Sequence, residues 1–398
     1  MLEAPETVAH DARHCAGCGK GWDGPERAVA GTALQEIDLK WGDSARPGLH
    51  RPVIEPLYHE QTCPGGHSTR AEARGGEVDP VLAGVALSAW RVAGPGAAAL
   101  RVALTLRFRL SRARIREFLW DGRGLAVSTG MISRTRHEAG AAMAPAEAQR
   151  VQEILESGLL HADATPWREQ GHALWRGVFT SLSVALYDVA HRGKERVENL
   201  LENVEGGRRR DGWTAYRWLP RRLRGWAHLI RKARGWAESD EAAAQGVGKQ
   251  VLATQETLMD AVSAARAGPP GVDWPARYAT ALSSLRQAGE RMQQGTHDQA
   301  RAWAVEILND REAIFHVLGH PHWPLTHNEA ERALRHGVIL RTLSYGTRTA
   351  QGSRIFALLA SVIDTGRQRH HSPGRYLQSA IRDRRAGLAL QPLPVAGK

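Results

Sequence analysis

Lysine, cysteine and long apolar stretches are scarce in this sequence of 398 residues. Only six lysines stand among 53 basic residues, and the three cysteines all precede residue 64. Because no run of about 18 apolar residues occurs, we expect no membrane-spanning helix and no membrane partner. The first residues lack a basic start followed by an apolar stretch, so no signal peptide is expected and the location expected by default is cytoplasmic.

The chain is strongly basic, with a formal net charge of +11 at pH 7. Each Lys or Arg placed on a phosphate releases a counterion, so this charge favours a polyanionic partner such as nucleic acid. Arginine also suits bidentate contacts to phosphate and guanine. A GC-rich coding bias would raise the arginine content as well, so the charge alone does not decide the function.

The apolar pattern changes several times along the chain. Residues 1–75 are rich in Gly, Pro, His and Cys, which predicts a small loop-rich module. Residues 80–158 and 225–318 have apolar side chains at helical spacing, the latter interrupted by a turn at 268–271. Between them, residues 159–216 contain the short apolar or alternating runs that are typical of strands. A sheet surrounded by helices predicts an α/β fold class.

Two sets of apolar residues support the predicted helices. Leu100, Leu104 and Phe108 recur at helical spacing in the first helical segment. In the second segment, one buried stripe is expected to contain Val251, Leu258 and Val262.

The cysteines form a pattern that is typical of a structural zinc site. Cys15 and Cys18 make a C-x-x-C pair, and Cys63 stands four positions before His67. An odd, clustered set argues against a disulfide framework. Three thiolates and one imidazole make a closed tetrahedral shell for Zn²⁺.

Two other histidines compete for the fourth position of this zinc site. His14 and His59 are both close enough in the sequence to replace His67 as a ligand. Scattered cysteines with no metal are the remaining interpretation. If zinc is bound, a module this small is expected to unfold without it.

A second motif is a candidate for DNA binding. Residues 109–119 predict a helix with a basic face, residues 121–124 a turn, and residues 128–136 a second helix capped by Ser128. This order resembles a helix-turn-helix, whose second helix enters the major groove of double-stranded DNA. Two packed helices with a solvated basic face are the alternative. The residues expected to face DNA are Ser128, Thr129, Ser133, Arg134 and Arg136.

Three carboxylates stand next to predicted strands or in a predicted helix. Asp163 ends an apolar run, and Asp211 follows another candidate strand. Glu331 lies in the second turn of a helix that should begin with a capping box of Thr326 and Glu329. Two Asp on neighbouring strands and a Glu on a packed helix can hold two Mg²⁺ ions about 4 Å apart for phosphodiester transfer. Spacing alone does not select these three from 42 acidic residues.

With these motifs, the chain resembles the transposases of the insertion-sequence-66 family from about Cys15 to Leu377. The resemblance rests on several motifs that occur in the family's order. They are the zinc module, Leu125-Ala-Val-Ser-Thr-Gly-Met-Ile132, His161-Ala-Asp-Ala-Thr-Pro166, Asp211-Gly-Trp-Thr-Ala-Tyr216, Trp226-Ala-His-Leu-Ile-Arg-Lys232, Pro324-Leu-Thr-His-Asn-Glu-Ala-Glu-Arg332 and Pro373-Gly-Arg-Tyr-Leu377.

The resemblance implies an RNase H-like catalytic core with a helical insertion, preceded by a small zinc-binding module and a helical DNA-binding region. The implied activity is cleavage and strand transfer of a mobile element, dependent on Mg²⁺ or Mn²⁺, with element ends and target as double-stranded DNA partners. A homo-oligomer is expected by analogy. The expected domains are a zinc module at 1–75, a helix-turn-helix region at 76–158, the first part of the core at 159–224, the insertion at 225–320 and the part carrying the Glu helix at 321–380.

The family's residue roles can be carried over to matching positions. The catalytic, magnesium-holding carboxylates map onto Asp163, Asp211 and Glu331. Further DNA contacts are expected from Trp226, His228, Arg231, Arg332 and Arg335, for which a solvated helix face is the alternative explanation.

The chain also departs from the family at several positions. Ala164 stands where the family has Glu, Gly225 where it has Cys, and Thr342 where it has Lys. The run 208–210 is all Arg, where a buried strand is normally apolar and a buried charge is costly. A second hypothesis is therefore a decayed or repurposed DNA-binding protein. A third is a nuclease of similar core that acts on RNA or branched DNA.

Overall fold

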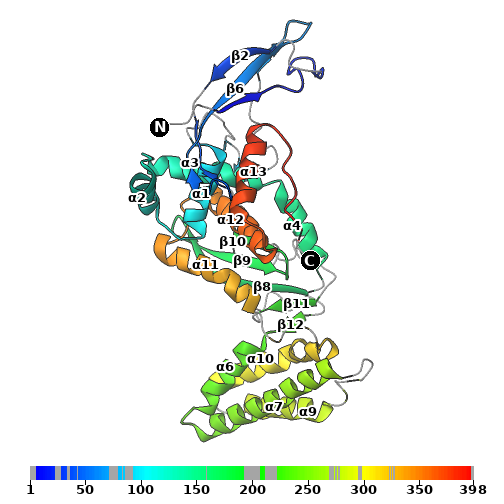
Figure 1. Ribbon diagram of the computed structural model, residues 1–398. Coiled ribbons are helices and arrows are strands. Elements are labelled where there is room, and N and C mark those ends of the chain that lie inside the picture. Colours follow the sequence, from blue (N-terminus) through cyan, green and yellow to red (C-terminus); the bar gives the residue numbers. More distant parts are fainter. Residues whose placement is uncertain are drawn as a thin grey trace.

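The computed structural model arranges the chain in three parts along one axis (Figure 1). A narrow sheet from the N-terminal residues lies at one end, a larger sheet with helices around it lies in the middle, and a bundle of helices lies at the other end. The residues that the structure describes are 6–22, 28–33, 36–42, 44–70, 79–82, 84–85, 93–157, 159–191, 207–210, 222–268, 273, 276, 278–294, 298–321, 323, 325 and 328–395.

The N-terminal part is a five-stranded sheet, not the loop-rich module expected from composition. Its central strand β6 pairs in parallel with β1 and antiparallel with β2, β3 and β7. Two of these strands have only two or three residues, and the longer ones, ETVAH, AVAGTA and VIEPLYHEQT, do not strictly alternate apolar and polar residues, which is why the prediction was wrong. The strands are β1 (Glu6–His10), β2 (Ala28–Ala33), β3 (Glu36–Ile37), β6 (Val53–Thr62) and β7 (Ser68–Arg70), with a separate pair β4 (Lys40–Trp41) and β5 (Leu49–His50).

The predicted helical character of residues 80–158 is confirmed for the described residues, with one apolar position misjudged. The first helix ends at Leu106, so Phe108 lies beyond it and is 65% exposed, whereas Leu104 is buried. The elements are η1 (Pro80–Leu82), α1 (Pro95–Leu106), α2 (Arg112–Arg123), α3 (Thr129–Met143) and α4 (Ala146–Leu155).

Two C-terminal helices join these N-terminal helices in one core. They are α12 (Ala350–Gln368) and α13 (Pro373–Arg385). An ion pair between Arg385 of α13 and Glu138 of α3, 2.8 Å apart, is almost entirely buried in this core. Arg385 also donates to the carbonyl of Ala93, just before α1.

The middle part is built on a five-stranded mixed sheet with the order β10-β9-β8-β11-β12. The strands β8, β9 and β10 are antiparallel neighbours, while β11 runs parallel to both β8 and β12. The predicted change from helix to strand near residue 159 is confirmed, and the arginine run before Asp211 forms a strand of four residues. The strands are β8 (Leu159–Glu169), β9 (His172–Thr180), β10 (Ala185–Ala190), β11 (Gly207–Arg210) and β12 (Arg222–Arg224).

Helices cover both faces of this sheet. On one face, α4 packs through Ile154 against a cluster that contains Leu160, Phe179 and Leu186. On the other face, α12 and α11 (Asn328–Ser344) cover the sheet. The buried residues of this second cluster are Val178, Ala185, Tyr187, Ala330, Leu334 and Ala357.

The helical bundle has a hydrophobic core of its own. The stripe expected there is confirmed, since Val251, Leu258 and Val262 are all buried. The elements are α6 (Trp226–Ala237), α7 (Ala242–Ala267), α9 (Ala279–Gln293), α10 (Asp298–Phe315) and η3 (His316–Gly319). None of the helices in the described part of the chain combines the length and hydropathy needed to span a membrane.

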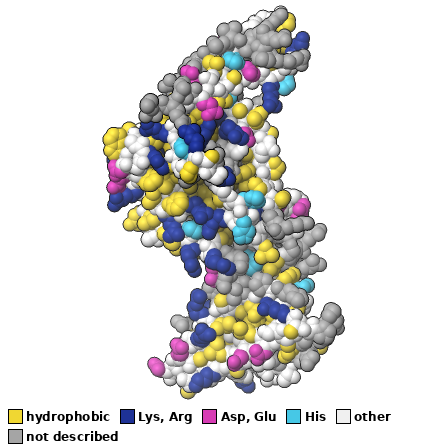
Figure 2. All heavy atoms as spheres, viewed as in Figure 1, with side chains coloured by type: hydrophobic (Ala, Val, Ile, Leu, Met, Phe, Trp, Pro, Cys, Tyr) yellow, Lys and Arg dark blue, Asp and Glu magenta, His cyan; other side chains and the backbone are white. Residues whose placement is uncertain are grey.

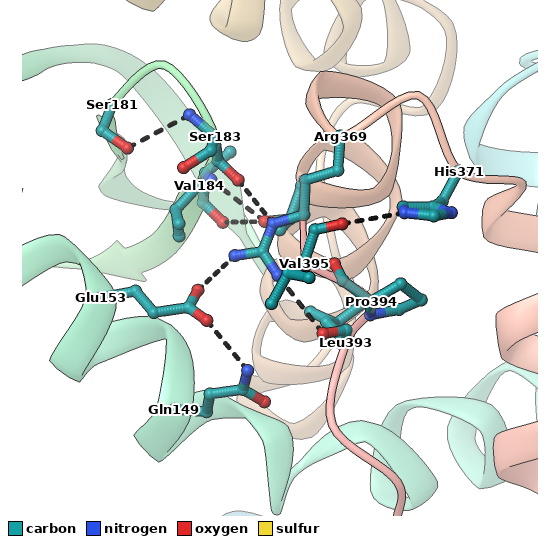
Figure 3. Close-up of polar contacts among 12 residues, drawn as sticks. Gln149, Glu153, Ser181, Ser183, Val184, Arg369, His371, Leu393, Pro394 and Val395 are labelled. Carbon is teal, nitrogen blue, oxygen red and sulfur yellow. Dashed lines mark hydrogen bonds and ion pairs between the residues drawn. The ribbon is translucent and has the colours of Figure 1, made fainter. Parts of the chain in front are cut away.

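Arg369 ties the last described residues to the core (Figure 3). Its buried guanidinium donates to the carbonyls of Ser183 and Pro394, each at 2.9 Å, and forms an ion pair with Glu153 of α4. Nearby, a His371 ring nitrogen lies 2.9 Å from the carbonyl oxygen of Val395. These contacts join the C-terminal segment to α4 and to the loop before β10.

Candidate functional site

The three cysteines and His67 meet at one end of the N-terminal sheet. The sulfur atoms of Cys15, Cys18 and Cys63 and a ring nitrogen of His67 all lie within 4.8 Å of one another. The Cys63 sulfur is 3.9 Å from that of Cys18 and 3.4 Å from Nδ1 of His67. These separations suit four ligands around one ion, since Zn–S and Zn–N bonds are about 2.3 and 2.0 Å long.

Two tight turns bring these ligands together. In the first, the amide of Gly19 donates to the carbonyl of Cys15 at 2.9 Å, and in the second, the amide of Gly66 donates to that of Cys63 at 2.8 Å. Both glycines have positive φ angles, 72° and 79°, which residues with a Cβ rarely adopt. These two glycines therefore allow the tight turns that bring the four side chains together.

The chemistry of this donor set fits zinc. A hydrogen bond from the backbone amide of Cys18 lowers the pKa of the Cys15 thiol to about 6, which favours the thiolate that a metal requires. His59 is not part of the cluster, because its Nδ1 lies 2.6 Å from the carboxylate of Asp11. His14 is also outside the cluster, so of the three candidate histidines His67 is the one that the structure brings to the cysteines.

Asp163 was expected at the end of a strand, but it lies in the middle of β8, the central strand of the larger sheet, because the strand continues through Thr165 and Pro166 to Glu169. Its carboxylate is half-buried and accepts a hydrogen bond from the amide of Ala164 at 2.7 Å. Asp163 stands opposite Val178 of β9, which in turn stands opposite Tyr187 of β10. Directly opposed residues in antiparallel strands point to the same face. Since Val178 and Tyr187 pack against α11, Asp163 also points to the face that α11 covers.

Asp211 lies outside the described residues, but the strand that leads to it is described. Arg210, the last residue of β11, pairs with Ala162, the residue before Asp163. Arg210 immediately precedes Asp211 in the sequence, so β11, the strand next to β8, ends one residue before Asp211.

Glu331 is half-buried in the first turn of α11, directly after the buried Ala330. The helix start expected near this point is confirmed, while the side chains of its capping box, Thr326 and Glu329, lie outside the described part of the chain. Through Ala330 and Leu334, α11 packs on the same face of the sheet as Asp163. Asp163 and Glu331 are thus on two elements in direct contact.

The helical turn also decides which flank of α11 carries Glu331. Residues two apart are about 200° apart around a helix, so Glu331 and Ala333 lie on nearly opposite flanks. Ala333 packs toward β10, where the Tyr187 hydroxyl donates to its carbonyl at 2.9 Å. Glu331 is therefore on the flank of α11 that faces away from β10. In the strand order, this is the side on which β8 and β11 lie.

The helix-turn-helix candidate forms two helices with a shorter turn than expected. The first helix continues through Asp121 to Arg123 and ends at Gly124, which has a positive φ of 62°. The predicted cap of the second helix is confirmed, because the Ser128 hydroxyl accepts from the amide of Met131 at 3.0 Å.

The start of this second helix is open to solvent. Ser128, Thr129 and Arg134 are exposed, and Ser133 is half-buried. From Glu138 onward, α3 is buried in the core. Recognition helices contact base edges with their N-terminal residues, so this exposed end is the one that the predicted DNA contacts require.

One residue predicted to contact DNA is instead part of the hydrophobic core. Trp226 is only 2% exposed, and its indole N–H donates to the carbonyl of Ile314 at 2.9 Å. The DNA-contact prediction for Trp226 is therefore wrong. Its helical spacing with Leu229 and Ala233, both buried, is the signal in the sequence that indicates a core residue. The His228 side chain lies outside the described part, and Arg231 is exposed.

Basic side chains gather near α11. On the face shown in Figure 2, dark-blue Lys and Arg side chains lie over the middle of the molecule, with few acidic ones among them. Arg332 and Arg335, both on α11 and predicted to contact DNA, are exposed. This distribution suits a polyanion lying along the same region as the two carboxylates.

Sequence reasoning missed the polar contacts beneath α11. Arg176 of β9 and Tyr187 of β10 both hydrogen-bond to its backbone. Their partners are more than 140 residues away in the chain, so no local spacing could have indicated them.

The comparisons with known proteins agree with the resemblance found in the sequence. The family model described as Transposase IS66 family matches residues 91–355, about two thirds of the chain. The match begins after the Cys/His cluster and includes Asp163, Asp211 and Glu331. No curated protein matches the chain significantly. On the family match, this chain belongs to the IS66 family of transposases.

Proposed function

We propose that this protein is a DNA transposase of the DDE type, which cuts the ends of a mobile element and joins them to target DNA. Its catalytic carboxylates are Asp163, Asp211 and Glu331. The middle part is an RNase H-like core into which α6–α10 are inserted. The Cys/His cluster holds a structural zinc ion, and the active form is a homo-oligomer on paired double-stranded DNA ends.

One observation carries this proposal. The helix with Glu331 covers the face of the sheet to which Asp163 points, and Glu331 stands on the flank toward β8 and β11. The neighbouring parallel strand β11 leads directly into Asp211, with Arg210 opposite Ala162.

The donor set suits Mg²⁺ or Mn²⁺. Carboxylate oxygens are preferred ligands for these hard cations. Asp163 and Glu331 are both half-buried, so neither residue is closed off from solvent. When bound, two such ions activate the attacking hydroxyl and stabilise the leaving oxygen.

The remaining roles belong to residues that position DNA. The exposed Arg332 and Arg335 follow Glu331 on α11 and are proposed to bind backbone phosphates. The exposed start of α3, with Ser128, Thr129 and Arg134, is proposed to bind DNA through the major groove. Arg231 is proposed to contact the same DNA from α6.

A cleavage assay tests the proposal. The substrate is a duplex with the terminal sequences that flank the coding region of the element, incubated with the full-length protein and Mg²⁺. We expect strand cleavage by the wild type and a loss of about a thousandfold or more in Asp163→Asn, Asp211→Asn and Glu331→Gln, since each removes a charge that holds the metal.

Glu329→Gln is the matched control, because it removes a carboxylate charge from the same turn of α11, has no proposed role in metal or DNA binding, and keeps a side chain that can serve the expected capping box. It should cleave like the wild type. Equal cleavage by the wild type and the Asp163 and Glu331 variants would disprove the assignment.

A DNA-binding protein without catalytic activity is the second candidate. It is favoured by the run of three arginines that forms β11 and by Ala164 beside Asp163. It predicts DNA binding that weakens steeply with salt and no metal-dependent cleavage in the same assay.

A further inference from the structure

A charged side chain lies fully buried between the larger sheet and α11. Arg176 of β9 is 1% exposed, and its Nη1 donates to the carbonyl of Leu334 at 3.1 Å. Its guanidinium also lies 4.4 Å from the centre of the Tyr187 ring. Burial lowers the pKa of Arg176 and raises that of Tyr187. Because burying a charge is costly, apolar side chains would cover this face at a lower cost.

Tyr187 makes the neighbouring contact to the same helix. Its hydroxyl lies 2.9 Å from the carbonyl of Ala333 and 2.5 Å from Oδ2 of Asp364 on α12. Two successive carbonyls of α11 are thus hydrogen-bonded by side chains of two adjacent strands. These contacts fix both the height and the rotation of the helix above the sheet.

Gly337 makes room for the contact with Arg176. A Cβ atom at this position would stand 1.6 Å from Nη1 of Arg176. Any side chain here would push the guanidinium away from α11 or lift the helix. The absence of a side chain therefore allows the close approach of helix and guanidinium.

A third contact lies at the other end of α11. Nη1 of Arg341 donates to the hydroxyl of Thr165 at 3.0 Å and also to the carbonyl of Pro166. Thr165 stands opposite Arg176 and two residues after Asp163, so all three point to the same face. Side chains of β8, β9 and β10 therefore each contact α11.

We propose that Arg176 is a positioning residue that sets Glu331 at the right distance and rotation relative to Asp163. The proposal rests on the function proposed above. Leu334, whose carbonyl Arg176 binds, follows Glu331 by about one helical turn. A rotation or shift of α11 at this contact moves the Glu331 carboxylate by a similar amount, and ligand cages for divalent cations tolerate little displacement.

Binding of Mn²⁺ tests this proposal without relying on catalysis. Free Mn²⁺ is measured by electron paramagnetic resonance while the full-length protein is titrated. We expect Arg176→Met to weaken Mn²⁺ binding about tenfold, because the loss of a contact that orients a metal ligand lowers metal affinity by roughly this factor. The Mg²⁺ concentration that gives half-maximal cleavage should rise in parallel. Arg176→Lys, which keeps a charged donor, should restore part of the affinity.

Leu186→Ala is the matched control. Leu186 precedes Tyr187 on β10 but packs on the opposite face, against α4. It should lower the melting temperature and leave Mn²⁺ affinity unchanged. If Arg176→Met does not fold, Tyr187→Phe takes its place, because it keeps the ring and removes only the hydroxyl, which contacts Ala333 of α11 and Asp364 of α12.

A pair of variants tests the geometry itself. Gly337→Ala should weaken Mn²⁺ binding because its methyl group displaces the guanidinium of Arg176. In the double variant, which also carries Arg176→Met, Gly337→Ala should cause no further loss of Mn²⁺ affinity. If the two substitutions instead lowered Mn²⁺ affinity additively, this result would contradict the proposed contact between Gly337 and Arg176.

The two proposals fail in different ways. If Asp163→Asn and Glu331→Gln bind Mn²⁺ as the wild type does, the proposed function fails. If those two variants lose Mn²⁺ while Arg176→Met and Tyr187→Phe only lower the melting temperature, the positioning role alone is overturned.

Discussion

The Cys/His cluster and the contact between α11 and the larger sheet are assembled over very different distances along the chain. Within the cluster, Cys15 and Cys18 belong to one tight turn, and Cys63 and His67 belong to another. The face that holds Asp163 is covered instead by a helix from 168 residues further on, which carries Glu331.

This difference has a physical consequence. Local turns place the four ligands in two pairs, and the pairing of β1 with β6 and a hydrogen bond from the Ala16 amide to Thr69 bring the two turns together. The position of α11 depends on packing and on buried hydrogen bonds from three strands. Substitutions at its own few residues should therefore disrupt the local Cys/His cluster. The geometry of the site at α11 should also be disrupted by substitutions far from its carboxylates.

Removing one cluster ligand should have the largest effect on stability. In Cys63→Ser, we expect loss of zinc and unfolding of residues 6–70, because structural zinc contributes on the order of 10 kcal/mol in small modules. Metal analysis should show one zinc ion per chain in the wild type. Hydrogen exchange should become fast in β6 and stay slow in β8.

His59→Ala is the control for this variant, since His59 lies outside the cluster. It should keep its zinc. Zinc retained by Cys63→Ser, or faster exchange in β8 as well, would show that the cluster is not an independent local site.

The second prediction concerns an ion pair that, like the contact at α11, joins distant parts of the chain. Glu138→Ala leaves Arg385 buried without its carboxylate partner, which should cost about 3–5 kcal/mol of unfolding free energy. Urea unfolding measures this loss. The exposed pair of Arg114 and Glu117, three residues apart in α2, is the control, and Glu117→Ala should cost less than about 1 kcal/mol. If Glu138→Ala and Glu117→Ala lowered the unfolding free energy by similar amounts, burial would not explain the contribution of the Arg385–Glu138 pair.

The smallest expected effect comes from a local feature, the cap of α3. Ser128→Ala removes the acceptor for the amide of Met131 and should cost about 1 kcal/mol. Ser111→Ala removes the equivalent cap of α2 and should cost about the same. Only Ser128→Ala is expected to weaken DNA binding in a mobility-shift assay as well. Equal DNA affinity in both variants would contradict a DNA-facing α3.

Local patterns in the sequence were sufficient for much of the fold. The buried stripe of Val251, Leu258 and Val262, the cap at Ser128 and the change from helix to strand at Leu159 are all in the structure as predicted. The same patterns failed where pairing is not local. The N-terminal sheet was missed because its longer strands do not strictly alternate apolar and polar residues, and Phe108 was misjudged because the helix ends two residues earlier.

The candidate site was only partly accessible to such reasoning. The three cysteines of the cluster followed from spacing and His67 was one of three candidate histidines, but Asp163, Asp211 and Glu331 were chosen through the family resemblance. The DNA contact predicted for Trp226 was wrong, because this side chain is buried. Helical periodicity alone already indicated a core residue. Burial in a separate core, not a neighbouring motif, decides what this side chain does.

Sequence alone indicated the three cysteines of the N-terminal cluster, the main helical and strand segments and the membership of the chain in its family, whereas the structure selected His67 among three candidate histidines. These depend on residues close together in the chain or on the order of motifs. Only the tertiary structure decided which face of the sheet carries Asp163, which flank of α11 carries Glu331 and how Arg176 reaches that helix. The reason is that packing and buried hydrogen bonds between segments more than 140 residues apart leave no local pattern in the sequence.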